Sequence, residues 1–68
     1  MTETEKETII DALDFGIVLG NEYFQKLKFL LRCSREEGDE EKENEYFRRL
    51  KETRSRINTL ETLKDQYK

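Results

Sequence analysis

A row of apolar and small residues spaced three and four apart constrains the fold of this chain more than any other feature. The row lies in the first half of the sequence and comprises Ile10, Leu13, Ile17, Gly20, Phe24, Leu27, Leu31 and Ser34. Steps of three and four keep side chains on one face of an α-helix, where a neighbouring helix can cover them. The row therefore predicts a long helix that packs against a second helix.

The second half of the chain carries a similar but more polar row. Its members are Tyr46, Leu50, Thr53, Ile57, Leu60, Lys64 and Tyr67. Charged residues make up 43% of the sequence, but they alternate with apolar residues at helical spacing, which favours order over disorder. Proline is absent, and the strong helix formers Glu, Lys, Leu and Arg dominate. These features predict an all-α protein.

The segment between the two rows predicts a tight turn. Gly38 is the best helix stop in the chain, because glycine adopts the left-handed conformation after a helix at little cost. Asp39 follows as a suitable N-cap for the next helix. We therefore expect an antiparallel two-helix hairpin in one domain (residues 1–68), with helices over about 4–37 and 40–66.

Two glycines in the first helix leave an alternative open. Gly16 and Gly20 each cost roughly 1 kcal/mol relative to alanine inside a helix. Gly20-Asn21 could end one helix and start another, which would give a three-helix bundle. However, the apolar row continues in phase through both glycines, which favours a continuous helix. Both glycines project onto the apolar face, where small residues permit close approach of a second backbone.

The first helix also has apolar residues at the edge or back of the side that the second helix covers. These residues are Phe15, Val18, Leu19, Phe29 and Cys33, with the i,i+4 pair Glu22 and Lys26 at their rim. A single neighbouring helix cannot cover both sides, so we expect a further partner. A two-fold homodimer that forms a four-helix bundle, with the first helices inside, is favoured. Docking of this face into a groove on a different, unidentified protein remains the other possibility.

The residue types present argue against an enzyme. The chain has no histidine and one cysteine, so it cannot build Cys/His zinc sites, Glu-x-x-His di-iron sites or Cys–His and Ser–His nucleophile pairs by itself. The glycines match no phosphate-binding loop. We therefore expect no catalytic residues, no metal, no cofactor and no small-molecule substrate.

Cysteine usage and hydropathy bear on where the chain acts. Cys33 has no second cysteine to pair with, and the chain shows no secretory signal pattern, so a reducing cytoplasm is expected. The longest uncharged run covers residues 15–21, which is far short of the roughly 20 apolar residues that cross a bilayer. No membrane partner is expected.

A basic segment supports the alternative function. Residues 1–45 carry 13 acidic and 6 basic side chains, whereas residues 48–68 carry 3 acidic and 7 basic. Candidate nucleic-acid contacts are Arg48, Arg49, Lys51, Arg54 and Arg56. At 100° per residue they spread around the helix, whereas a surface that follows phosphates concentrates charge on one face. The favoured function is a small interaction protein, such as a regulator, adaptor or inhibitor; the alternative is a small RNA- or DNA-binding regulator.

Overall fold

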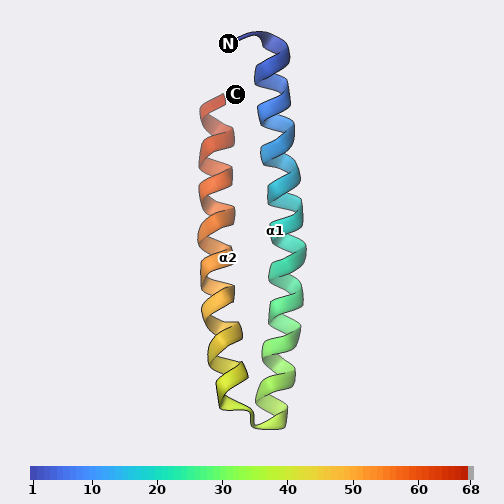
Figure 1. The fold of residues 1–68 in the computed structure, drawn as a ribbon, viewed down its shortest axis with the longest axis vertical. Coiled ribbons are helices and arrows are strands. Elements are labelled where there is room, and N and C mark those ends of the chain that lie inside the picture. The colour runs from blue at the N-terminus through green and yellow to red at the C-terminus, as the bar shows by residue number, and fades with distance from the viewer. Residues whose placement is uncertain (68) are drawn as a thin grey trace.

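The computed structural model describes residues 1–67; Lys68, which the single-domain prediction includes, lies outside them. Within these residues the chain forms two helices, α1 (Glu3–Glu37) and α2 (Glu40–Tyr67). They run antiparallel, side by side, so that both chain ends lie at the same end of a rod measuring 53 × 14 × 12 Å (Figure 1). The predicted hairpin is confirmed, and its helix bounds differ from those expected by one residue at each outer end.

The ends of α1 are fixed by local hydrogen bonds. At its start, the Thr2 hydroxyl oxygen accepts a hydrogen bond from the backbone N–H of Glu5 at 3.1 Å. Acidic side chains in the first turn, Glu3 and Glu5, suit the positive end of the helix dipole. This cap satisfies one of the backbone donors that a helix start leaves without a partner.

The turn is built around Gly38, as predicted. Gly38 has a φ of 74°, in the left-handed region. Its N–H donates to the Arg35 carbonyl at 3.2 Å, and the N–H of Asp39 donates to the Ser34 carbonyl at 3.0 Å. This pair of bonds is a Schellman motif, which closes the end of α1. The Asp39 carboxylate then caps α2 by accepting from the backbone N–H of Lys42 at 3.1 Å.

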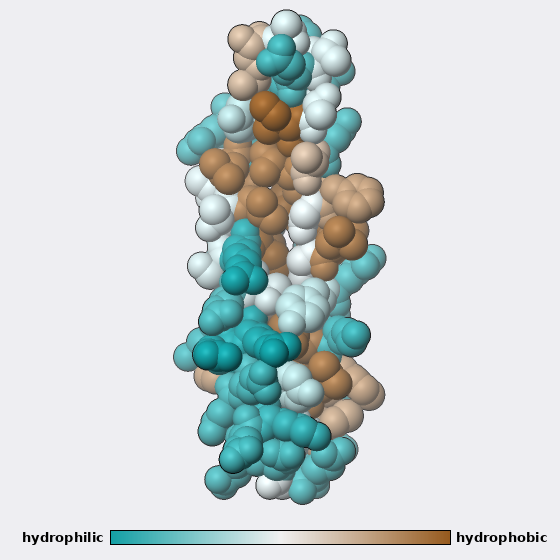
Figure 2. Space-filling view, viewed as in Figure 1, coloured by the Kyte–Doolittle hydropathy of each residue, from teal (hydrophilic) through white to brown (hydrophobic). Residues whose placement is uncertain are grey.

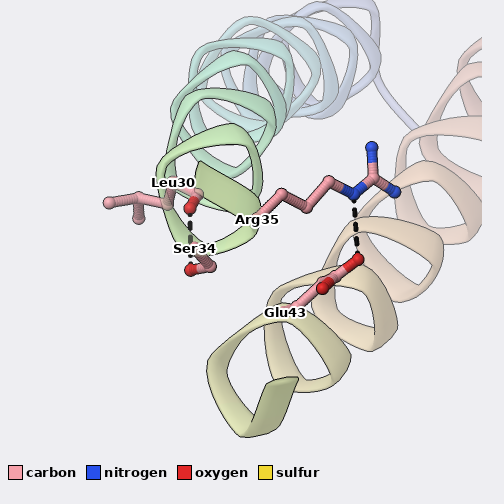
Figure 3. Close-up of polar contacts among 4 residues, drawn as sticks. All are labelled: Leu30, Ser34, Arg35 and Glu43. Carbon is pink, nitrogen blue, oxygen red and sulfur yellow. Dashed lines mark hydrogen bonds and ion pairs between the residues drawn. The ribbon is translucent and has the colours of Figure 1, made fainter. Parts of the chain in front are cut away.

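Side chains next to the turn form one contact between the helices and one within α1 (Figure 3). Arg35 reaches across from α1, and its Nε donates to Glu43 Oε1 at 3.0 Å. The buried Ser34 turns its hydroxyl back to its own helix and donates to the Leu30 carbonyl at 2.9 Å. Because the Arg35–Glu43 pair is solvent-exposed, it contributes at most about 1 kcal/mol.

The two predicted rows form the interface between α1 and α2. Leu27 and Ile57 are 1% and 2% exposed, and Leu31 is also buried. Every other member of the two rows is buried or half-buried. The core of the hairpin is therefore a single seam between two helices, with few fully buried apolar side chains.

Both α1 glycines lie against α2. A Cβ atom on Gly20 would sit 2.8 Å from Ile57 Cγ1, and one on Gly16 would sit 3.1 Å from Leu60 Cδ1. α1 continues through both positions without a break, so the three-helix alternative is wrong. The physical reason is that the missing side chains let α2 approach closely, and this packing offsets the weak helix propensity of glycine.

Two contacts made by charged side chains cross the seam, and both fit a single alignment of α1 with α2. Lys64 of α2 forms an ion pair with Asp14 of α1, and this hydrogen bond raises the pKa of Lys64. Nearer the turn, the Arg54 guanidinium lies 5.6 Å from the centre of the Phe24 ring. The long basic side chains of α2 therefore cover the edges of the seam with their stems.

Candidate interaction surface

The side of α1 that faces away from α2 is the candidate site, and we call it the outer face. It consists of the seven residues singled out from the sequence: Phe15, Val18, Leu19, Glu22, Lys26, Phe29 and Cys33. Its large apolar side chains are open to solvent: Phe15 is 68% exposed, Phe29 62%, Val18 57% and Leu19 52%. Cys33 is half-buried. The structure thus places all seven residues on α1 and leaves the four large apolar side chains more than half exposed.

Helix geometry explains why α2 cannot cover these side chains. Successive residues of an α-helix are rotated by about 100°, so Phe15 and Phe29 point away from the seam that contains Leu27 and Leu31. α2 packs its own apolar row on that seam, and residues 1–67 contain no third helix that could cover the outer face. The outer face is therefore a consequence of having two apolar stripes on one helix.

The end of the outer face remote from the turn is hollowed. A shallow hollow of about 470 Å³ is lined by Asp11, Asp14, Phe15, Val18, Leu19 and Glu22. Its floor is apolar and its rim is acidic, because carboxylates stand on both sides of Phe15 and Val18. Sequence reasoning identified the apolar floor but missed Asp11 and Asp14. Asp11 precedes Phe15 by four residues and Asp14 precedes Val18 by four, and this spacing is the signal that would have found them.

A charged pair occupies the middle of the outer face. Glu22 and Lys26 are both exposed, and within residues 1–67 neither forms an ion pair. The intrahelical pair expected from their i,i+4 spacing is therefore not formed. Both charges remain available to groups of another molecule.

Apolar surface also continues from the outer face into the groove between the helices. Figure 2 shows brown surface gathered between α1 and α2 in the half remote from the turn, while teal predominates in the half near the turn. This groove, of about 290 Å³, includes Leu19, Tyr23 and Leu60 among its lining residues. Leu19 belongs to both the hollow and the groove, so the two are continuous. Sequence reasoning missed Tyr23, which lies off both apolar rows.

The basic segment of α2 is divided among several local contacts. Arg49 pairs with Glu45 at 2.8 Å, as its i,i+4 spacing predicts, and a hydrogen bond with Tyr23 raises the pKa of Arg49. The Lys51 ammonium lies 4.6 Å from the centre of the Phe47 ring. These contacts, with Arg54 over Phe24, show three of the five basic side chains engaged with the hairpin itself.

The remaining two basic residues differ in setting. Both are exposed, and Arg56 also lines the groove beside Leu60. The structure therefore does not gather the five side chains into one stripe, and nucleic-acid binding by this segment stays a prediction.

Two findings on the described residues concern metal sites and membrane spans. Within residues 1–67, no group of three or more Cys, Asp or Glu side chains is arranged to hold a metal ion. Neither helix, over that same range, combines the length and apolar character that crossing a membrane requires.

Comparisons with other proteins give no family. No model of a known protein family matches the chain, and neither a curated protein nor a solved structure matches it.

Proposed function

We propose that this chain is a non-enzymatic interaction protein that self-associates through the outer face of α1, and that the same face binds a protein target. One observation carries the proposal: Phe15, Val18, Leu19 and Phe29 are each more than half exposed although the hairpin is complete. Large apolar side chains that gather on one exposed face of a small protein mark a surface that another molecule covers.

The energetics of the hairpin support the proposal. Only Leu27, Leu31 and Ile57 are buried apolar side chains within residues 1–67, so the seam alone provides a small core. Burying one large apolar side chain contributes roughly 1.5–3 kcal/mol. Covering Phe15 and Phe29 would therefore add to the stabilisation that the seam provides, and a second hairpin that presents the same face covers both at once.

Self-association and target binding use the same residues, so they compete. A target that binds the outer face more tightly than a second copy would convert the assembled form into a one-to-one complex. This behaviour suits a small regulator, adaptor or inhibitor that is stored as an assembly and released by its target.

The test compares two exposed phenylalanines of the outer face with one elsewhere. Phe15→Gln and Phe29→Gln in combination remove the apolar contacts but keep a residue with good helix propensity. Sedimentation velocity should show that the wild-type chain self-associates and that the double variant is monomeric, with helix content by circular dichroism retained. Phe47→Gln is the matched control, because Phe47 is 45% exposed but lies on α2, and it should associate as the wild type does.

Two results would defeat the proposal. The first is a wild-type chain that stays monomeric and folded at high concentration, because such a chain does not self-associate. Equal association by the double variant and the Phe47→Gln control would show that the outer face is not the contact. If the double variant loses its helix content, the two single variants at Phe15 and Phe29 provide the same comparison.

A further inference from the structure

We propose that two copies pair antiparallel along the outer face, in one register that brings Glu22 of each copy against Lys26 of the other. In this register, residue i of one α1 lies level with residue 48 − i of the second. The inference rests on the proposed self-association and adds its orientation and alignment. The occupant of the outer face is thus a second copy of this chain.

The outer face contains its own heptad row. Its members, spaced three and four apart, are Phe15, Leu19, Glu22, Lys26, Phe29 and Cys33. Such spacing is that of the contact positions in a pair of coiled helices. The row is apolar at both ends and charged in the middle, with an acid before a base. This order makes the row sensitive to the direction of its partner.

The antiparallel register matches every position of the row. Phe15 lies level with Cys33 of the second copy, and Leu19 lies level with its Phe29. Glu22 lies level with Lys26, and the two-fold axis repeats all three pairings on the other side. The six layers span about 27 Å along α1 at 1.5 Å per residue. Apolar groups meet apolar groups, and each central charge meets its opposite.

Other alignments fail at the charged centre. Sliding one copy by a heptad in either direction puts Lys26 level with Phe15 or Phe29, and Glu22 level with Leu19 or Cys33. A charge would then be covered by apolar groups and left without a partner. A parallel, in-register pair instead puts Glu22 against Glu22 and Lys26 against Lys26, which is repulsive. Charge complementarity therefore selects one orientation and one register.

The hairpin leaves room for this pairing. α2 runs along one side of α1 (Figure 1), and Phe15 and Phe29 of the row are 68% and 62% exposed, so a second α1 can reach these positions. Glu22 and Lys26 have no ion pair to give up within residues 1–67. The assembly is a four-helix arrangement with the two α1 helices inside and the two α2 helices outside.

Charge reversal tests the register. Glu22→Lys and Lys26→Glu each turn two attractive pairs into two repulsive pairs, so each should weaken dimerisation by about tenfold or more at low salt. The double variant Glu22→Lys/Lys26→Glu restores opposite charges and should associate within about threefold of the wild type. Matched controls are Glu52→Lys and Arg48→Glu, which change the net charge equally at exposed positions of α2 and should not alter the dimer constant.

Distance measurement tests the orientation. In a Cys33→Ser background, a spin label attached to the Glu37→Cys variant reports the separation of the two α1 ends. The antiparallel register separates these ends by about 40 Å along the axis, from 26 residues at 1.5 Å each. A parallel pair would bring the labels within about 20 Å, the width of two adjacent helices.

The outcomes separate this inference from the proposed function. A wild type that associates, and that responds to Phe15→Gln/Phe29→Gln, supports the proposed function. If Glu22→Lys then weakens it no more than Glu52→Lys, or if the labels lie close together, the antiparallel register is wrong and self-association stands. A monomeric wild type overturns both.

Discussion

Replacing Gly20 with alanine should destabilise the hairpin, whereas the same replacement at Gly16 should stabilise it. Both glycines lie inside α1, and alanine is favoured over glycine there by about 1 kcal/mol. Both also face α2, so the sequence alone treats them as equivalent. The structure distinguishes them by the atom that the new methyl group would meet.

At Gly20 the new methyl group has no room. It would lie 2.8 Å from Ile57 Cγ1, an atom close to the α2 backbone on a side chain that is only 2% exposed. The helices must separate to accept it, and overpacking of this kind costs typically about 1–3 kcal/mol. After the gain in helix propensity, Gly20→Ala should reduce the free energy of unfolding by about 1 kcal/mol.

At Gly16 the obstacle can move. The nearest atom is Leu60 Cδ1 at 3.1 Å, a terminal methyl group on a half-buried side chain. A small rotation of Leu60 relieves the contact, so most of the propensity gain remains. Gly16→Ala should therefore raise the free energy of unfolding by up to about 1 kcal/mol.

Urea and thermal unfolding followed by circular dichroism, at equal chain concentrations, would measure the difference. The two variants should differ by about 2 kcal/mol, which corresponds to roughly 10 °C in Tm for a domain of this size. Ile57→Ala provides the control, because it removes the obstructing atom; in that background Gly20→Ala should become stabilising. The reasoning is refuted if Gly20→Ala is as stable as Gly16→Ala, or if its cost is unchanged in the Ile57→Ala background.

Two further predictions concern the turn and the ion pair that crosses the seam. Gly38→Ala should lower the free energy of unfolding by about 1 kcal/mol, because φ at this position is 74° and alanine disfavours the left-handed region. Gly38→Asn should lower it by less, because asparagine adopts this conformation more readily. Equal losses for the two variants in chemical denaturation would contradict this reasoning. The hydrogen bond with Asp14 raises the pKa of Lys64 above its ordinary value of 10.5, so its contribution is complete below that pH and is lost as the pH rises through the higher folded value. Between pH 9 and pH 12 the wild type should thus lose more stability than Lys64→Met in urea titrations, and parallel losses would show that the pair contributes nothing.

Much of the fold follows from local rules that operate within a few residues. The step of three and four residues decides which face of each helix is apolar, and every member of the two predicted rows is buried or half-buried. Gly38 ends α1 in the left-handed conformation that its residue type favours, and Asp39 caps α2 as its position predicts. The exposed position of Phe15 and Phe29 follows from the same periodicity.

The candidate site was predicted less completely. The outer-face residues were identified from their angular position, but Asp11, Asp14 and Tyr23 were not, because they lie off the apolar rows. Whether Glu22 and Lys26 pair within α1 also depends on side-chain conformation, and the expected pair does not form within the described residues.

The helices, their apolar faces and the position of the turn follow from residues that are close in the chain, because periodicity and capping act over a few residues. Three contacts instead appear only when the helices pack together: Gly20 against Ile57, Gly16 against Leu60 and the ion pair of Asp14 with Lys64. These contacts depend on how far one helix slides along the other and on the distance between their axes. Steric fit across the whole seam fixes both quantities, and no single stretch of sequence contains them.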